Sequence, residues 1–122
     1  MAGAVLLDVT KLEQALAEFS RERDWDQFHT PKNLVMALTG EVGELNEIFQ
    51  WMTDSLASEA GRSPATAEHV GEELADVLLY LVRLSNVLGV NLNDAVVDKL
   101  AKNALKYPID KARGSSQKAG KL

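Results

Sequence analysis

Cysteine is absent from this chain, and histidine, proline and aromatic residues are scarce. Without a thiol there is no disulfide, no thiolate zinc site and no cysteine nucleophile. Neither His29 nor His69 follows a glutamate by three residues, so the Glu-x-x-His pattern of di-iron bundles is excluded. No apolar run is long enough to span a membrane, and the apolar start MAGAVLLDV is too short for a signal peptide. We therefore expect a soluble, cytoplasmic protein with no membrane partner.

Charge is distributed unevenly along the 122 residues. Residues 1–97 carry 6 basic and 16 acidic side chains, whereas residues 98–122 carry 7 basic and 2 acidic ones. Basic segments often bind nucleic acid, but the acidic part of this chain would repel a polyanion. We therefore expect no polymeric nucleic acid as a partner. A small phosphorylated ligand, joined to the acidic part by a metal ion, suits both halves.

Four helices are predicted from their start and stop signals, and the length fits one domain. They cover about residues 10–21, 31–52, 64–88 and 92–107. Thr10 with Glu13 resembles a capping box, Gly89 ends the third helix, and Asn91 caps the fourth. No β-alternating run competes with this pattern, so we expect an all-α four-helix bundle.

The segments outside these helices are polar or basic. We expect residues 53–62 (TDSLASEAGR) to form a mobile loop between the second and third helices. Residues 109–122 contain Gly114-Ser115-Ser116 and several basic side chains, so we expect a flexible tail after a domain of residues 1–108.

Two acidic motifs lie on the second and third predicted helices. Glu41 and Glu44 are three residues apart, as are Glu73 and Asp76, so each pair projects from one helix face. Like charges at this spacing cost a helix a few tenths of a kcal/mol per pair. One such pair alone usually marks a solvated face, but two indicate a site for a hard divalent cation. Oxygen ligands suit Mg²⁺ or Mn²⁺, and Mg²⁺ commonly shares its coordination with substrate phosphates.

The helix faces beside these motifs are apolar and aromatic. The predicted core stripes are Leu34, Leu38, Val42, Leu45 and Phe49 on the second helix, and Leu74, Val77, Leu78, Leu81, Leu84 and Leu88 on the third. Trp51 and Tyr80 lie further along the acidic sectors, which suits phosphates at one end of a nucleotide and its base at the other. Gly40 and Gly43 flank Glu41, where a close helix approach would explain their low helix propensity.

The spacing of these residues resembles the signature of the all-α MazG-like nucleoside triphosphate pyrophosphohydrolases, in which ExxE is followed by ExxD. Here 28 residues separate the two motifs. Other segments resemble the dCTP pyrophosphatase branch: RDWDQFH (23–29), GEVGEL (40–45), FQW (49–51), EELADVLLYLVRL (72–84), K-x-x-x-N-x-x-x-Y-P (99–108) and ARGSS (112–116). The resemblance covers about residues 10–116. It implies Mg²⁺-dependent cleavage of a nucleoside triphosphate to monophosphate and pyrophosphate by a MazG-like domain, residues 1–108, in dimers or dimers of dimers.

The resemblance also implies roles for individual residues. The metal ligands would be Glu41, Glu44, Glu73 and Asp76, with Mn²⁺ as a possible substitute for Mg²⁺. Glu41 and Glu44 would also be catalytic, one of them orienting the attacking water. Substrate-binding residues near the base would be Trp25, Asp26, Gln27, Phe28, His29, Trp51 and Tyr80. Phosphates or base would be met from a neighbouring subunit by Lys99, Asn103, Lys106 and Tyr107.

One position departs from the pattern of the animal dCTP pyrophosphatases. Leu16 occupies the place of their first-helix histidine, nine residues before Trp25. The missing polar contact leaves open a broad-specificity nucleoside triphosphate or dUTP pyrophosphatase. A third hypothesis is a non-catalytic helical module that binds nucleotide or a partner through its acidic face. This last hypothesis predicts no pyrophosphate release from any nucleotide.

Overall fold

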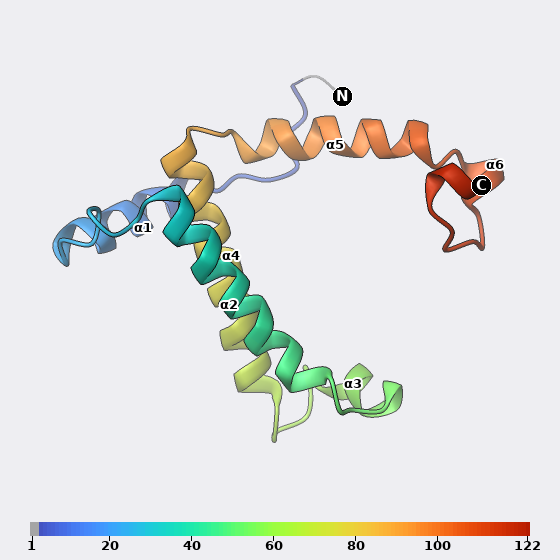
Figure 1. Ribbon diagram of the computed structural model, residues 1–122, viewed down its shortest axis with the longest axis horizontal. Helices are drawn as coiled ribbons and strands as arrows, with labels where there is room; N and C mark the ends of the chain where they lie inside the picture. Colours follow the sequence, from blue (N-terminus) through green and yellow to red (C-terminus); the bar gives the residue numbers. More distant parts are fainter. Residues whose placement is uncertain (1–2) are drawn as a thin grey trace. The chain divides into compact units, whose positions relative to one another are not determined.

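The computed structural model describes residues 3–122, which form α-helices, one short 3-10 helix and no β-strand (Figure 1). The elements are α1 (Thr10–Glu22), α2 (Pro31–Phe49), α3 (Asp54–Glu59), α4 (Ala67–Leu88), α5 (Leu92–Lys106), α6 (Ile109–Ala112) and η1 (Ala119–Lys121). The predicted all-α class and four long helices, α1, α2, α4 and α5, are confirmed. None of the helices in residues 3–122 is long and apolar enough to cross a membrane.

The chain forms two compact units. Thr10–Val90 make up one unit, and Asn91–Leu122 with the segment up to Val9 make up the other. In the latter, Asn93 holds the N-terminal segment. Its Oδ1 accepts from the backbone N–H groups of Leu6 and Leu7 at 2.8 and 3.0 Å, and its Nδ2 donates to the Ala4 carbonyl at 2.8 Å. The predicted domain boundary at residue 108 and the flexibility of the tail stay predictions.

Several helix ends follow from local capping chemistry. The Thr30 hydroxyl accepts from the Asn33 N–H ahead of Pro31, and Asn91 accepts from the Asp94 N–H at 3.0 Å. Gly89 ends α4 in the left-handed conformation, with φ of 70°. These three signals are confirmed. The predicted start of α4 is wrong by three residues, because residues 63–66 form a turn in which the Ser63 carbonyl accepts from Ala67.

The predicted loop of residues 53–62 is wrong, because it contains α3. The Thr53 hydroxyl accepts from the Leu56 N–H at 3.2 Å, which satisfies one free donor at the start of this six-residue helix. After Pro108, the basic tail likewise contains α6 and η1. Such short helices carry too few residues for hydrophobic periodicity to distinguish them from loops.

The pairing of α2 with α4 organises the larger unit. These helices lie side by side and run in opposite directions, and α1 also packs against α4 (Figure 1). Leu34 of α2 and Val82 of α4 are almost completely buried, at 2% and 0% exposure. The face of α4 turned inward therefore carries Val82.

The predicted leucine face of α4 is not the core of this chain. Four of its members are exposed: Leu74, Leu78, Leu81 and Leu88. The buried residues of α4 are instead Val70, Glu73, Val82, Arg83 and Ser85. On α2 the prediction is right for Leu34 and wrong for Val42, which is exposed. Hydrophobic periodicity identifies the leucine face of α4 correctly as apolar. Within residues 10–90, however, α1 and α2 cover a different face of α4, which also carries polar residues.

Gly40 and Gly43 do not mark a close approach within the chain. Apart from its chain neighbours and the backbone of its own helix turn, a Cβ atom added at either glycine would meet no heavy atom of the described residues within 4 Å. The expected explanation for these glycines is therefore wrong for the single chain. The surface beside Glu41 is open at this point of α2.

Two glycines of α4 give a matched stability test. We expect Gly89→Ala to destabilise the fold by about 1 kcal/mol, because alanine is strained at a φ of 70°. We expect Gly71→Ala to stabilise it by about 0.5–1 kcal/mol, because it lies inside the helix with open space around it. Urea unfolding measures both. Effects of the same sign would contradict the helix end at Gly89.

Candidate functional site

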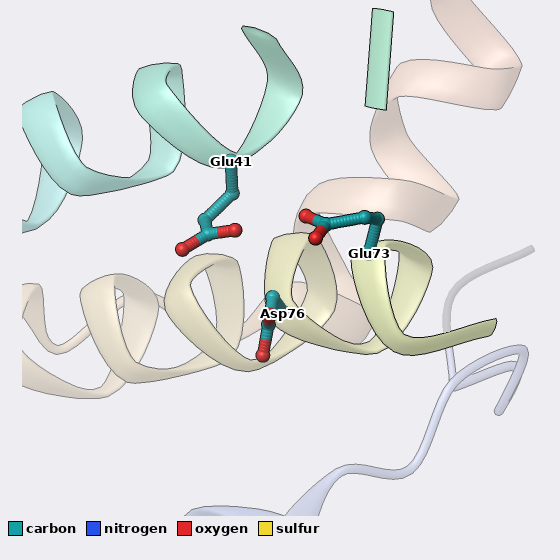
Figure 2. A group of neighbouring side chains, drawn as sticks. All are labelled: Glu41, Glu73 and Asp76. Carbon is teal, nitrogen blue, oxygen red and sulfur yellow. The ribbon is translucent and has the colours of Figure 1, made fainter. Parts of the chain in front are cut away.

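Three carboxylates meet between α2 and α4. One oxygen each from Glu41, Glu73 and Asp76 lies within 4.8 Å of the others (Figure 2). Glu73 is buried, and Glu41 and Asp76 are partly buried. The antiparallel pairing brings Glu41 of α2 against the turn of α4 that carries the other two. This group of three residues is called the carboxylate cluster below.

Two oxygens of the carboxylate cluster lack a partner among residues 3–122. Oε2 of Glu41 and Oε2 of Glu73 are buried and have no hydrogen-bond partner in the described residues. An unsatisfied buried polar group costs about 1–3 kcal/mol. Hard divalent cations bind through such oxygens. The donor set and its orphaned oxygens therefore fit a divalent metal ion.

Crowding changes the acidity of Glu41. Removal from water and the close carboxyl groups of Glu44, Glu73 and Asp76 together raise the pKa of Glu41 from 4.5 to about 7. Each cause disfavours the charged carboxylate. A cation within the cluster would reverse that preference, because its positive charge favours the ionised form.

Glu44 lies beside the carboxylate cluster rather than within it. It is exposed, and its carboxyl group contributes to the raised pKa of Glu41. Glu44 and Glu73 also line an open hollow of about 520 Å³ together with Glu47, Ile48, Met52, Thr66 and His69. In this hollow Nε2 of His69 is 3.5 Å from Oε1 of Glu73. Of the four predicted metal ligands, three form the cluster and the fourth adjoins it.

A mostly apolar cavity of about 220 Å³ begins at the same turn of α4. Its lining residues are Leu16, Phe19, Trp25, His29, Asp76, Leu79, Tyr80 and Arg83. Asp76 therefore belongs to both the carboxylate cluster and the cavity wall. Phe19 and Trp25 meet edge to face with ring centroids 5.7 Å apart, and Trp25 and His29 are 6.2 Å apart. The cavity offers flat apolar walls next to the carboxylate cluster.

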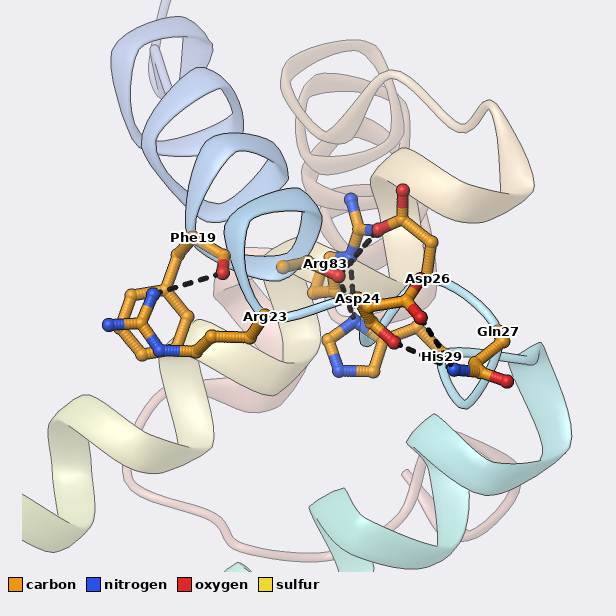
Figure 3. Close-up of polar contacts among 8 residues, drawn as sticks. Phe19, Arg23, Asp24, Asp26, Gln27, His29 and Arg83 are labelled. Carbon is orange, nitrogen blue, oxygen red and sulfur yellow. Dashed lines mark hydrogen bonds and ion pairs between the residues drawn. The ribbon is translucent and has the colours of Figure 1, made fainter.

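Two residues that line this cavity, His29 and Arg83, belong to a polar network (Figure 3). The buried Arg83 donates from Nε to Nδ1 of His29 at 3.0 Å and from Nη2 to Oδ1 of Asp26 at 3.0 Å. Ser20, which is fully buried, donates to the same Asp26 oxygen at 2.5 Å. Burial and the nearby positive charge of Arg83 lower the pKa of His29, while Asp26 acts in the opposite direction.

The predicted base-binding residues are divided between the cavity and the surface. Trp25, His29 and Tyr80 line the cavity, whereas Asp26 is paired with Arg83. The others lie outside it: Gln27 donates to Asp24, Phe28 is 58% exposed, and Trp51 is 89% exposed. If Gln27, Phe28 and Trp51 contact the base, the contact lies outside this cavity.

The remaining predicted residues lie in the unit formed by Asn91–Leu122. Lys99, Asn103 and Lys106 are on α5, and Tyr107 follows its end. Tyr107 lines a shallow hollow of about 730 Å³ with Ala104, Ile109, Asp110 and Arg113. Their roles as ligands stay predictions.

Sequence reasoning missed Arg83 and Ser20. Arg83 follows Tyr80 by three residues and Asp76 by seven, so helical spacing puts it on the face that carries both. A basic residue inside the apolar run LLYLVRL was a second signal, because a buried cation needs a partner. Its partners, Asp26 and His29, are 57 and 54 residues away in the sequence.

Comparisons with known proteins agree with the all-α fold. The MazG-like family model matches residues 37–122. dCTP pyrophosphatase 1 of Homo sapiens is 49% identical over 117 residues, covering 96% of this chain and 67% of that protein. The Mus musculus protein of the same name is 46% identical over 113 residues, covering 93% and 65%. This chain thus spans about two thirds of the length of these relatives.

A solved structure supports the fold independently. The crystal structure of a pyrophosphatase from Archaeoglobus fulgidus superposes with a TM-score of 0.75 at 42% sequence identity, over 80% of this chain and 90% of that one. The relatives and the solved structure are all named as pyrophosphatases, and they place this all-helical chain in the class of nucleoside triphosphate pyrophosphohydrolases. This chain belongs to the MazG-like family.

Glu41→Gln tests the carboxylate cluster without a nucleotide. A pKa of about 7 against 4.5 means that folded, metal-free protein binds more protons than unfolded protein between those pH values. Stability therefore falls as pH rises through this window. We expect Glu41→Gln to stabilise the metal-free protein at pH 8, on the order of 1–2 kcal/mol after screening, and to change little at pH 4.

The same variant should lose its response to metal. We expect millimolar Mg²⁺ to raise the melting temperature of the unaltered protein but not that of Glu41→Gln, because binding to the folded state alone stabilises it. Glu22→Gln, an exposed position at the end of α1, is the control and should change neither result. An equal Mg²⁺ response in both proteins would show that Glu41 is not a ligand.

Proposed function

We propose that this protein is a cytoplasmic, Mg²⁺-dependent pyrophosphohydrolase that cleaves dCTP, or a modified dCTP, to dCMP and pyrophosphate. The oxygen of a water molecule adds to the α-phosphorus, and the bond from that phosphorus to the oxygen bridging to the β-phosphate breaks. Relatives named dCTP pyrophosphatase 1, 46–49% identical over most of this chain, support the assignment. Removal of unwanted nucleotides from the pool is the role that fits such a reaction.

The observation that carries this proposal is the shared position of Asp76. This residue belongs to the carboxylate cluster and also lines the apolar cavity. A nucleotide has the same division, with charged phosphates that need a cation at one end and a flat base at the other. A substrate whose base occupies the cavity has its phosphates next to the cluster.

The roles of the residues follow from this arrangement. Glu41, Glu73, Asp76 and Glu44 hold the metal ion in this proposal. When bound, Mg²⁺ neutralises phosphate charge and lowers the pKa of a coordinated water. Glu44, outside the cluster but beside Glu41, orients the attacking water by accepting its hydrogen bond. Trp25 and Tyr80 hold the base by stacking, worth about 1–3 kcal/mol per base in other proteins.

A broader base preference is the second candidate. Leu16 lines the cavity and offers only methyl groups to a base. An apolar wall rejects a related base weakly, whereas an unpaired polar group in the wall rejects it strongly. The position of Leu16 is therefore the observation behind the broad-specificity or dUTP alternative.

Pyrophosphate release distinguishes these functions. We expect release from dCTP with Mg²⁺, none with a chelator, and a loss of at least about 100-fold in kcat for Glu41→Gln, since a misplaced metal ion removes several kcal/mol of transition-state stabilisation. Glu22→Gln should retain full activity. A panel of deoxy- and ribonucleoside triphosphates then measures base preference.

Each alternative has its own outcome in that panel. Equal kcat/KM across the bases would replace the dCTP assignment with a broad-specificity enzyme. No release from any nucleotide would support the non-catalytic helical module instead. Nucleotide binding unaffected by Glu41→Gln would point the same way.

We also propose that the protein is a homodimer or a dimer of dimers. Leu74, Leu78, Leu81 and Leu88 form an exposed apolar stripe along α4, and the surface at Gly40 and Gly43 of α2 is open. Large exposed apolar patches are typical of protein interfaces. A second copy would cover the stripe and bring its own Lys99, Asn103, Lys106 and Tyr107 to the assembly.

Charge introduced into the stripe tests the oligomer. We expect Leu78→Asp to shift the protein to a smaller species in light scattering, because burying an unpaired carboxylate costs several kcal/mol. Ser58→Asp, at a polar position of α3, is the control and should leave the size unchanged. A fully active monomer for the unaltered protein would contradict the proposal.

A further inference from the structure

Arg83 of α4 is a buried cation, and its neighbours in the sequence, Val82 and Leu84, are apolar. Only 9% of its surface is exposed, and it lines the cavity that the proposed function gives to the base. Its guanidinium contacts groups at the end of α1 and in the turn that follows. Nε meets His29 at 3.0 Å, and Nη2 meets Asp26 at 3.0 Å and Ser20 at 3.5 Å.

These contacts determine which nitrogen of His29 carries the proton. The guanidinium has N–H donors and no acceptor, so Nδ1 of His29 must accept from Nε of Arg83. Ser20 is also 3.3 Å from Nδ1, but its single proton is engaged in the 2.5 Å bond to Asp26. The ring proton is therefore on Nε2, which Figure 3 shows on the side of the imidazole away from Arg83.

The ring also stays neutral in this arrangement. A second proton on Nδ1 would point at the guanidinium, and burial together with the Arg83 charge lowers the pKa of His29. The charged partner that opposes this shift, Asp26, is itself paired with Arg83. His29 is thus held as a neutral imidazole with one donor of fixed direction.

We propose that Arg83 is a positioning residue for base recognition. By occupying Nδ1 of His29 it presents the Nε2–H of that ring as a hydrogen-bond donor to an acceptor atom on the base, a ring nitrogen or carbonyl oxygen of a pyrimidine. This inference rests on the proposed function of the site. Because Leu16 cannot form a hydrogen bond with the base, the inference assigns that hydrogen bond to the Arg83–His29 pair.

The first test reads the tautomer directly and needs no substrate. In ¹⁵N-histidine protein we expect NMR signals of a neutral Nε2–H ring for His29, assigned by their loss in His29→Asn. Arg83→Gln should move these signals towards a mixture of tautomers, because an amide can donate or accept at that position. Arg62→Gln is the control, since that arginine is exposed and its partners among residues 3–122 are Glu59 and the Ser58 carbonyl.

The second test separates positioning from a purely structural role. We expect Arg83→Gln to raise the KM for dCTP about 10-fold with kcat changed less than about 3-fold, because losing one directed hydrogen bond weakens binding by about that factor. Arg62→Gln should change neither constant. A structural role alone would lower the amount of folded enzyme and leave KM unchanged.

Two substitutions of His29 keep the inference testable if Arg83→Gln does not fold. Glutamine can put an amide N–H near the place of Nε2, whereas asparagine can match only the Nδ1 side. We expect His29→Gln to keep KM within about 3-fold and His29→Asn to raise it about 10-fold. The reverse order would overturn the inference.

The outcomes separate this inference from the proposed function. No pyrophosphate release by the unaltered protein would overturn the function and the base contact together. An active Arg83→Gln enzyme with unchanged KM and unchanged His29 signals would overturn the inference alone. Altered signals with a raised KM support it.

Discussion

The carboxylate cluster is the constraint around which the larger unit is organised. Glu41, Glu73 and Asp76 repel one another, and two of their buried oxygens have no partner in the described residues. The antiparallel packing of α2 on α4, with Leu34 and Val82 buried, holds the three together against this repulsion. Stability lost at a functional site is commonly recovered when its ligand binds. A metal ion would supply the missing attraction, so packing and function depend on one another here.

One face of α4 connects the cluster to the cavity. Glu73 and Asp76 are followed on that face by Tyr80 and then by Arg83, so charge changes from negative to positive over about three turns. The order matches the proposed substrate, with the metal and phosphates at the acidic end and the base beside Tyr80. Arg83 does not face the phosphates in this reading, because its guanidinium is already engaged by Asp26 and His29.

Helix capping was predictable from the sequence, because it depends on neighbouring residues. Which helix faces are buried was not predictable, because it depends on residues far away in the sequence. The caps at Thr30 and Asn91 involve neighbours three residues away, so short-range spacing identified them correctly. Predicting that Glu41 faces α4 required the second acidic motif and the family resemblance. Periodicity found the leucine face of α4 but could not say whether this chain covers it. The Arg83 network escaped prediction because its partners lie more than fifty residues away.

Base discrimination depends on groups of fixed direction rather than on the shape of the cavity alone. Leu16, Phe19 and Leu79 provide apolar walls that accept any flat ring of suitable size. In the proposed function Trp25 and Tyr80 would add stacking, which also tolerates every base. A rigid N–H donor differs, because a base without an acceptor at that point leaves the donor unpaired. With a leucine at position 16, our proposal assigns this selectivity to His29, whose ring orientation is set by Arg83 of α4.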